Sequence, residues 1–458
     1  MNLNKLIEKF KAKKRILFTT PSHNQGEFIA PRNKKLLGEK IFQADYSEIE
    51  DFDNLADPKG IILKSQLNAS TIYESKYTFY LTNGSTSGII ASMLAILEQN
   101  DKVLIARNCH KCVYNALVLT GAYPIWLMPD FNEEWGIFKP IKAEQVEKKL
   151  MQDETIKALV ITNPSYEGVI SNIQKISDVC KKYNVKLIVD EAHGSLWSFD
   201  GSIGTPAIYE GADISVQSLH KTAGALNPSA VLHINKESSI SVERIQESLN
   251  ILNTTSPSYP ILANIEATID FLNSKKGKKK IFELTNTLVK FKKGLQKYNN
   301  IEIFSSNNDI TKILIKIEGI SGYELSSILF NKYKIEDELS NNISVLFLTG
   351  IGTTQWKLDK LKKALIKISK KVSEEKFKSE EDYKKSPIYP APQVVFSPRR
   401  VYSQSYKLLK PQEAIGGISQ ELIISYPPGI PILIPGEVIK EEHSELLSDY
   451  DNLKVLQT

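Results

Sequence analysis

Small and hydroxyl-bearing residues gather in Thr82–Gly88 (TNGSTSG), between an apolar stretch and a helical pattern. Small side chains let the backbone approach an anion closely, and a helix N-terminus offers unpaired N–H groups with a partial positive charge. The hydroxyls of Ser85, Thr86 and Ser87 would add hydrogen-bond donors. The run predicts a phosphate site, although Ser and Thr are also ordinary helix caps. It matches neither G-x-x-x-x-G-K-[ST] nor G-x-G-x-x-G, which disfavours a nucleotide loop.

A carboxylate and an imidazole follow another apolar stretch, in Ile188–Gly194 (IVDEAHG). Asp190 could pair with a protonated pyridine nitrogen, which keeps the ring cationic so that it withdraws electrons. The alternative is an aspartate that caps the next turn. His193 stands three positions on, but the H-E-x-x-H spacing of a zinc protease is absent.

A lysine beside polar groups ends the segment Ser215–Thr222 (SVQSLHKT). Confined near cationic or apolar groups, Lys221 would have a lowered pKa and could attack an aldehyde as a neutral amine. His220 and Ser218 lie beside it. The alternative is a solvated surface lysine, which is what most lysines are.

A second imidazole, His110 in Arg107–Lys111 (RNCHK), could stack on an aromatic ring or could be a hydrogen-bonded loop histidine. Taken together, the four stretches offer a phosphate cup, a stacking ring, a carboxylate for a ring nitrogen and an amine for an aldehyde. Those are the parts of a pyridoxal phosphate (PLP) site. Asp190 and Lys221 are 31 positions apart (221 minus 190), which leaves room for one crossover between neighbouring strands.

Cysteine usage and charge exclude several other functions. Cys109 and Cys112 form a C-x-x-C with only His110 between them and no second ligand pair, so we expect no metal site. Three cysteines in 458 residues suit a reducing compartment, and we expect the cytoplasm. The 58 basic and 53 acidic side chains nearly balance, and mixed tracts such as Lys275–Lys280 favour a solvated face over a nucleic-acid patch. Met1–Arg15 predicts an amphipathic helix without the apolar core of a secretory signal, and no stretch is long enough to span a membrane.

The elements that must position these residues alternate between short β-rich runs and helical patterns over residues 77–235. This order predicts an α/β fold with a mostly parallel central sheet and helices on both faces. Ligands in such sheets are held by loops at the carboxyl ends of the strands. Helices are expected at 88–97 and 173–183, and strands at 77–81, 102–106, 123–127, 158–162, 186–190, 214–217 and 229–234.

The rest of the chain predicts smaller units around that sheet. We expect an N-terminal arm over 1–35, a large domain over 36–295 and a small α+β domain over 296–370, with strands at 312–317 and 344–348. A Lys-, Glu-, Ser- and Pro-rich linker over 371–393 would lead to a C-terminal domain over 394–458.

With these motifs in order, the chain resembles the fold-type-I, PLP-dependent ornithine/lysine/arginine decarboxylases over most of its length. The resemblance lies in seven motifs: Thr20–Gly26 (TPSHNQG), Asn83–Gly88, Arg107–Lys111, Thr162–Gly168 (TNPSYEG), Asp190–Gly194, Ser218–Thr222, and Tyr426–Pro431 (YPPGIP) with Pro435–Glu437 (PGE). One motif and the stretch that follows Lys221 depart from the family pattern. Ser22 and Asn24 replace the usual Gly and Lys, and Asn227-Pro228 stands where relatives commonly carry Thr-Gln, which puts the substrate in doubt.

By that resemblance, Lys221 carries PLP as a Schiff base, Asp190 pairs with the pyridine nitrogen and His110 stacks on the ring. His193 would lie near the ring oxygen or the substrate, and His220 would assist orientation and proton transfer. The phosphate would be bound by Ser85, Thr86, Ser87 and Ser218. The resemblance also implies a short form without the N-terminal wing domain, assembled as a homodimer or a dimer of dimers.

The implied reaction is the decarboxylation of a basic amino acid, with arginine before lysine and ornithine, feeding polyamine synthesis. Glu437 is a weak candidate for binding the guanidinium group. Another fold-type-I enzyme, such as an aminotransferase or a lyase, is the first alternative, but residues 301–370 contain no arginine for a substrate carboxylate. A catalytically silent decarboxylase-like regulator is the second.

Overall fold

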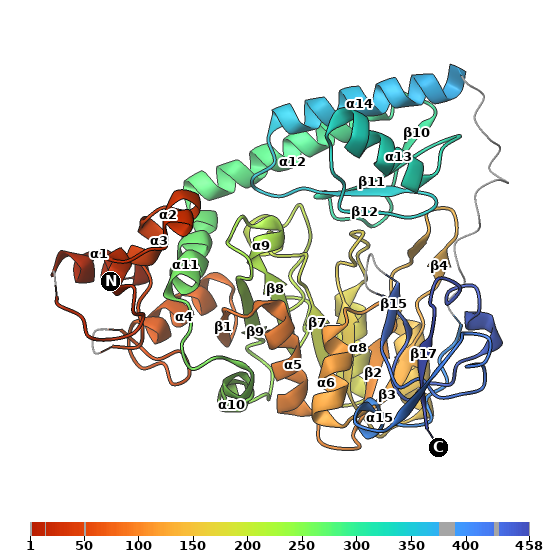
Figure 1. Cartoon of the computed structure of the whole chain (residues 1–458), viewed down its shortest axis with the longest axis horizontal. Coiled ribbons are helices and arrows are strands. Elements are labelled where there is room, and N and C mark those ends of the chain that lie inside the picture. Colours follow the sequence, from red (N-terminus) through yellow and green to blue (C-terminus); the bar gives the residue numbers. More distant parts are fainter. Residues whose placement is uncertain (1, 14, 50–51, 375–389, 426–429, 458) are drawn as a thin grey trace.

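The computed structural model describes residues 2–13, 15–49, 52–374, 390–425 and 430–457. A central sheet with flanking helices forms the body of the molecule (Figure 1). A small unit lies over the end of that sheet where the strands run out, and a C-terminal unit lies against one side.

The central sheet has seven strands in the order β1-β9-β8-β7-β6-β2-β3. Neighbours from β8 through β3 are parallel, whereas β9 runs antiparallel to both β8 and β1. The sheet is therefore mostly parallel, as predicted. The strands are β1 Tyr77–Leu81, β2 Lys102–Ala106, β3 Tyr123–Leu127, β6 Ile156–Thr162, β7 Lys186–Asp190, β8 Ile214–Ser218 and β9 Ala230–Ile234.

Alternating side chains of these strands form two separate cores, one on each face of the sheet. Val103 and Ile105 of β2 pack with one set of helices, and Leu104 and Ala106 pack with the other. This follows from the two-residue period of a strand, with helices on both faces accounting for the nearly continuous apolar runs. The first face is covered by α5 Gly84–Ile96, α6 Cys112–Thr120 and α10 Val242–Leu252, and the second by α7 Ala143–Gln152 and α8 Ile173–Lys182.

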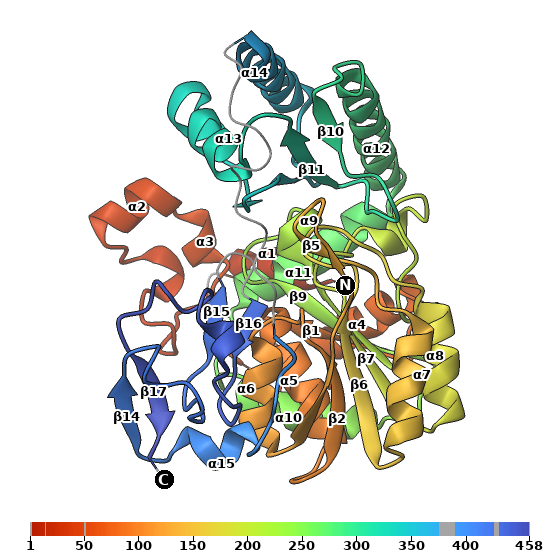
Figure 2. The same ribbon diagram turned by 90° about the vertical axis from the view of Figure 1, so that its right-hand side faces the viewer.

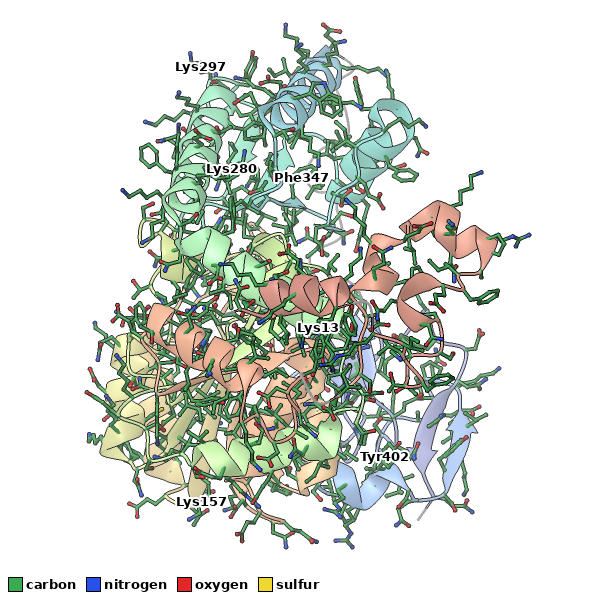
Figure 3. The ribbon with its side chains drawn as sticks, turned by 90° about the vertical axis from the view of Figure 1, so that its left-hand side faces the viewer. Lys13, Lys157, Lys280, Lys297, Phe347 and Tyr402 are labelled. Atoms are coloured by element: carbon green, nitrogen blue, oxygen red, sulfur yellow. The ribbon has the colours of Figure 1, made fainter. Side chains whose placement is uncertain are left out.

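The small unit contains a four-stranded antiparallel sheet in the order β10-β11-β13-β12. Its strands are β10 Ile301–Ile303, β11 Lys312–Ile317, β12 Leu339–Ser340 and β13 Val345–Leu348, with α13 Gly322–Ile328 and α14 Gln355–Glu374. Helix α12 Lys275–Leu295 packs against β10 and α14, although the sequence places it in the large domain, so the small unit begins in space before residue 296. The five lysines of the Lys275–Lys280 tract are exposed, in keeping with a solvated face, and Figure 3 labels one of them, Lys280, on this helix.

The N-terminal segment is only partly an arm. Helix α1 Leu3–Ala12 buries Leu3, Leu6 and Phe10 against α11 Tyr259–Asn273 and α4 Ile61–Ile72, so its amphipathic pattern is explained by packing on the body. Helices α2 Pro31–Leu37 and α3 Lys40–Gln43 contain no buried residue, and α2 projects from the body (Figure 2).

The C-terminal unit consists of α15 Pro398–Tyr402 and two antiparallel pairs of strands. These are β14 Tyr406–Leu409 with β17 Leu453–Leu456, and β15 Ile423–Ser425 with β16 Ile430–Leu433. Residues 426–429 of the YPPGIP motif and 375–389 of the expected linker lie outside the described residues. Across the described ranges, no helix is long and apolar enough to cross a membrane.

Candidate active site

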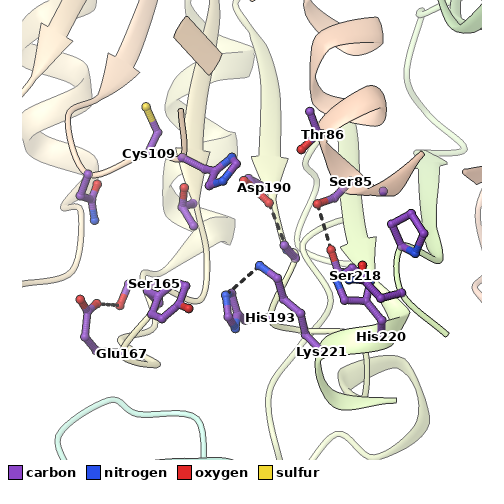
Figure 4. Close-up of a pocket in the computed structure, with 18 of the residues that line it drawn as sticks. Ser85, Thr86, Cys109, Ser165, Glu167, Asp190, His193, Ser218, His220 and Lys221 are labelled. Carbon is purple, nitrogen blue, oxygen red and sulfur yellow. Dashed lines mark hydrogen bonds between the residues drawn. The ribbon is translucent and has the colours of Figure 1, made fainter. Parts of the chain in front are cut away.

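A cavity of about 260 Å³ lies at the carboxyl ends of the central strands, beneath the small unit. The structure brings eight of the nine predicted site residues to its wall (Figure 4): Ser85, Thr86, His110, Asp190, His193, Ser218, His220 and Lys221. The loops that carry them follow β1, β2, β7 and β8, as expected for a parallel sheet.

Lys221 stands on the short helix α9 Leu219–Thr222, directly after β8. Its Nζ lies 3.0 Å from Nε2 of His193 and 5.9 Å from the centre of the Tyr166 ring. Burial lowers the pKa of Lys221, and the charge of Asp190 partly opposes that shift. The lysine therefore has an increased fraction of neutral, nucleophilic amine.

His193 is buried, and its Nδ1 has no hydrogen-bond partner in the part of the chain that the structure describes. Burial, followed by the charge of Lys221, holds the pKa of His193 well below its usual value, so the ring is neutral. A charged lysine has no lone pair and must donate, which makes Nε2 the acceptor. His193 is thus placed to accept a hydrogen bond from Lys221 and to fix the direction of the amine.

Asp190 ends β7 and is buried, and its Oδ1 accepts a hydrogen bond from the backbone N–H of Ala192 at 3.1 Å. His110 lies on the opposite loop, where its Nδ1 accepts from the backbone N–H of Cys112 at 3.2 Å. Because Nδ1 accepts, the ring proton sits on Nε2, and burial further lowers the pKa of His110. A neutral flat ring and a carboxylate therefore border the same cavity.

Two of the three hydroxyl residues in the predicted phosphate cup line the cavity. Ser85 and Thr86 lie in the first turn of α5, and the Ser85 hydroxyl is 2.9 Å from that of Ser218. Ser87 is not among the residues that line the cavity: it is buried and donates to the carbonyl of Gly84 at 2.9 Å. One turn of the helix points successive side chains in different directions, so three adjacent hydroxyls do not all face one ligand.

His220 lines the cavity, and its Nδ1 lies 3.0 Å from the carbonyl oxygen of Ser229. Asn227 and Pro228, where the sequence departs from the family pattern, also line the cavity. This departure from the family pattern therefore lies at the wall of the cavity, where it can affect which ligand binds.

Several wall residues received no role from the sequence. Thr162 and Asn108 each place a buried side-chain oxygen that has no partner among the described residues, as expected where a polar ligand would bind. Tyr166 and Glu167 also line the cavity, and Ser165 donates to Glu167 at 2.8 Å. Thr162, Tyr166 and Glu167 belong to the TNPSYEG motif, which signalled the segment but not which side chains face the cavity.

Glu437, the weak candidate for guanidinium binding, lies outside the cavity wall. Both of its carboxylate oxygens accept from Arg107, at 2.7 and 2.8 Å. That expectation was wrong, because the sequence could not show that a carboxylate 330 positions away is occupied by this arginine.

The wall fits pyridoxal phosphate. Hydroxyls at a helix N-terminus suit a phosphate, the Asp190 carboxylate suits a ring nitrogen, Lys221 suits an aldehyde, and the unsatisfied oxygens of Thr162 and Asn108 await a polar ligand.

Residues 2–314 match the major domain of the Orn/Lys/Arg decarboxylases, and residues 381–457 match their C-terminal domain. The chain belongs to this family. It is a decarboxylase of a basic amino acid, and its cofactor is pyridoxal phosphate.

Individual relatives agree with that placement. The decarboxylase is 31% identical over 448 residues to an arginine decarboxylase of Bacillus subtilis, covering 95% of this chain and 91% of the relative. Its fold matches a lysine decarboxylase of Francisella novicida with a TM-score of 0.86 at 22% identity, covering 99% of this chain and 81% of that one. An alanine–glyoxylate aminotransferase of Nostoc shares the fold more distantly, with a TM-score of 0.54 at 15% identity over 69% of this chain and 88% of that one. The comparisons favour the decarboxylase over the aminotransferase and the silent regulator.

Proposed function

We propose that this enzyme decarboxylates arginine to agmatine and CO₂, with lysine and ornithine as poorer substrates, and that the product feeds polyamine synthesis. Its similarity to an arginine decarboxylase along nearly the whole chain supports arginine. The observation that carries the chemistry is the 3.0 Å contact between Lys221 Nζ and His193 Nε2 inside a cavity that Asp190 also lines.

Each wall residue has a proposed task. Ser85, Thr86 and Ser218 bind the cofactor phosphate, Asp190 holds the ring nitrogen protonated, and His110 covers one face of the ring. When bound, the cofactor supplies a sink for the electron pair that remains as CO₂ leaves.

Lys221 and His220 move protons, and His193 orients the lysine. Nε2 of neutral His193 accepts a hydrogen bond from Nζ of Lys221 and so directs the amine within the cavity. After CO₂ has left, Lys221 or His220 is placed to deliver a proton to Cα, because both line the cavity.

Two carboxylates are candidates for the guanidinium end of the substrate. Glu167 lines the cavity, but burial raises its pKa, which favours the neutral form. Glu338 is exposed, accepts a hydrogen bond from the Tyr166 hydroxyl at the cavity wall, and raises the pKa of Lys221 by its charge. Glu338 itself lies outside the cavity wall, but we assign the guanidinium to it because its exposed carboxylate is bonded to Tyr166, a residue of that wall.

We further propose a homodimer. Ile16, Phe18, Phe28 and Leu36, in the N-terminal segment, are 74–97% exposed, and a second copy of the chain would cover them.

Purified enzyme with added pyridoxal phosphate, incubated separately with arginine, lysine and ornithine, tests the assignment. We expect CO₂ release to be fastest from arginine, with agmatine as the amine formed. Lys221→Ala should lose at least about 10³-fold in kcat, since the lysine both holds the cofactor and moves protons. Faster CO₂ release from lysine would make lysine the preferred substrate and would leave the proposed decarboxylation unchanged. No CO₂ release from any of the three amino acids would contradict the proposed function.

A further inference from the structure

Arg107 and Glu437 form a buried ion pair that the reaction outlined above does not use. The guanidinium and the carboxylate meet through two hydrogen bonds of 2.7 and 2.8 Å, and their side chains are only 3% and 1% exposed. The pair joins the large domain to the C-terminal unit, which packs beside α6 through α15 (Figure 2).

Each partner is held by further contacts that fix its direction. Arg107 Nη2 also donates to the carbonyl of Ile432 at 3.1 Å, and the guanidinium carbon lies 4.5 Å from the ring centre of Trp126. Glu437 accepts from the backbone N–H of Ile434 at 2.9 Å. The planar guanidinium group stacks on the Trp126 ring and donates hydrogen bonds from both Nη atoms. Together these contacts fix the Arg107 side chain in one orientation.

Arg107 begins the loop that carries His110. Its carbonyl accepts from the Tyr114 hydroxyl at 3.4 Å, and that hydroxyl lies 3.3 Å from Sγ of Cys109, so the loop is closed across its base. The far end is fixed where the Cys112 N–H donates to His110 Nδ1 at 3.2 Å. Arg107 therefore anchors the loop that presents the His110 ring to the cavity.

Stability alone does not explain such a pair. Desolvating two charges costs about as much as their attraction returns, and well-packed apolar residues of similar volume are often as stable or more so. Directional hydrogen bonds, by contrast, fix geometry in a way that apolar packing does not.

We propose that Glu437 and Arg107 are positioning residues, through which the C-terminal unit holds the His110 loop in the geometry that the reaction needs. Neither side chain lines the cavity, and both act through His110. The inference rests on the proposed role of His110 but is tested separately from it.

Two cysteines in the His110 loop allow its opening to be measured by chemical labelling. Cys109 and Cys112 flank His110 and are free, buried thiols, while Cys180 is a free, buried thiol on α8, on the other face of the sheet. Alkylation of each thiol by iodoacetamide, followed by mass spectrometry of the holoenzyme, measures how often each site opens. In Glu437→Gln, one carboxylate acceptor becomes an N–H donor facing Arg107, and the fork is lost.

We expect Glu437→Gln to label Cys109 and Cys112 about tenfold faster while Cys180 stays within twofold of the parent. Its kcat on arginine should fall about tenfold, because a small displacement of a cofactor-contacting group is costly. Arg107→Lys keeps the positive charge but loses the two parallel hydrogen bonds to Glu437, so it should raise the labelling rates of Cys109 and Cys112 and lower kcat. It tests the proposal if Glu437→Gln does not fold.

Tyr123→Phe is the matched control. It removes another contact between the large domain and the C-terminal segment, the 3.0 Å hydrogen bond to the Val394 carbonyl, without touching the loop. It should leave all three labelling rates and kcat unchanged. Unchanged labelling of Cys109 and Cys112 in the ion-pair variants would overturn the proposal, as would an equal rise at Cys180, which would signal general loosening. Faster labelling of Cys109 and Cys112 with a parental kcat would show that the ion pair holds the His110 loop, and it would overturn the proposal that the reaction needs this geometry.

Discussion

Lys221 and His193 show how far single residues could be assigned from the sequence. The sequence placed Lys221 at the end of a strand in a parallel sheet, and the family resemblance placed His193 near the cofactor. The structure puts Nζ of the lysine 3.0 Å from Nε2 of the histidine. Ser87 and Glu437 lie outside the cavity wall. Spacing along the chain gives proximity to the site, but only the helix turn and the tertiary partner decide where a side chain points.

Glu338 gives a prediction about the substrate. In Glu338→Gln an amide oxygen can still accept from Tyr166, but the negative charge is gone. We expect KM for arginine to rise about tenfold with kcat nearly unchanged, because hydrogen bonds to charged groups contribute about 1.5–3 kcal/mol. Steady-state kinetics measure this, with the exposed Glu336→Gln as control. An equal effect in both variants, or none in either, would remove Glu338 from substrate binding.

Glu191, next to Asp190, gives a prediction about pH. Burial raises its pKa from about 4.5 to about 8 in the folded chain, where it accepts hydrogen bonds from Ala207 and Gln217. Between those pH values the folded chain keeps a proton that the unfolded chain has released. The stability linked to that proton is present at low pH and is lost as pH rises toward 8, by at most about 1.4 kcal/mol per pH unit.

Glu191→Gln should therefore flatten the fall in unfolding free energy between pH 5 and 8. The Gln217 side chain can adapt by turning its amide, since its Oε1 has no partner among the described residues. Denaturant titrations at several pH values measure the slope. The exposed Glu237→Gln should keep the parental slope, and a parental slope in Glu191→Gln would show that Glu191 is ionised when folded.

At the scale of elements, the strands and the mostly parallel course of the sheet were predictable, but the antiparallel course of β9 was not. The predicted runs at 77–81, 102–106, 123–127 and 186–190 coincide with β1, β2, β3 and β7, because apolar runs bounded by turn residues leave few other interpretations. The antiparallel course of β9 carries no signature in its own residues, since β9 is fully buried, as are most residues of the parallel strands β6, β7 and β8. The short β10 and β12 lack the length that would give a pattern.

Gly88 tests how α5 positions the phosphate cup. A Cβ there would lie 2.6 Å from Cδ1 of Leu81 and 2.8 Å from Cγ1 of Val216, so the helix lies against the sheet only because this residue has no side chain. Gly88→Ala should lower the free energy of unfolding by about 1–3 kcal/mol and weaken cofactor binding, because the helix N-terminus must shift. Thermal melts and cofactor titration measure both, with Gly201→Ala as control, since nothing lies within 4 Å of that position. Parental cofactor affinity in Gly88→Ala would show that the neighbouring side chains give way instead.

At the scale of the whole molecule, helix α12 packs on the small unit, although the expected large domain over 36–295 includes it. Helix α12 is amphipathic, and amphipathicity shows that one face is buried but not against which unit. Its packing on β10 and α14 is decided by the small sheet, whose shortest strands the sequence did not reveal. The proposed dimer likewise depends on apolar residues of the N-terminal segment, and the sequence alone could not show that they are exposed.

The exposed N-terminal residues make the dimer testable. Ile16, Phe18 and Leu36 are 86%, 97% and 80% exposed, and burying each such side chain would contribute about 1.5–3 kcal/mol. Sedimentation velocity should show a dimer at micromolar concentration, and Phe18→Asp with Leu36→Asp should shift it toward monomer, because two carboxylates would have to be desolvated at the interface. Trp356→Asp, on α14 and 67% exposed, is the matched control and should remain dimeric. If the parent chain sediments as a monomer, or only the Trp356 variant dissociates, then these apolar residues do not mark the contact between copies.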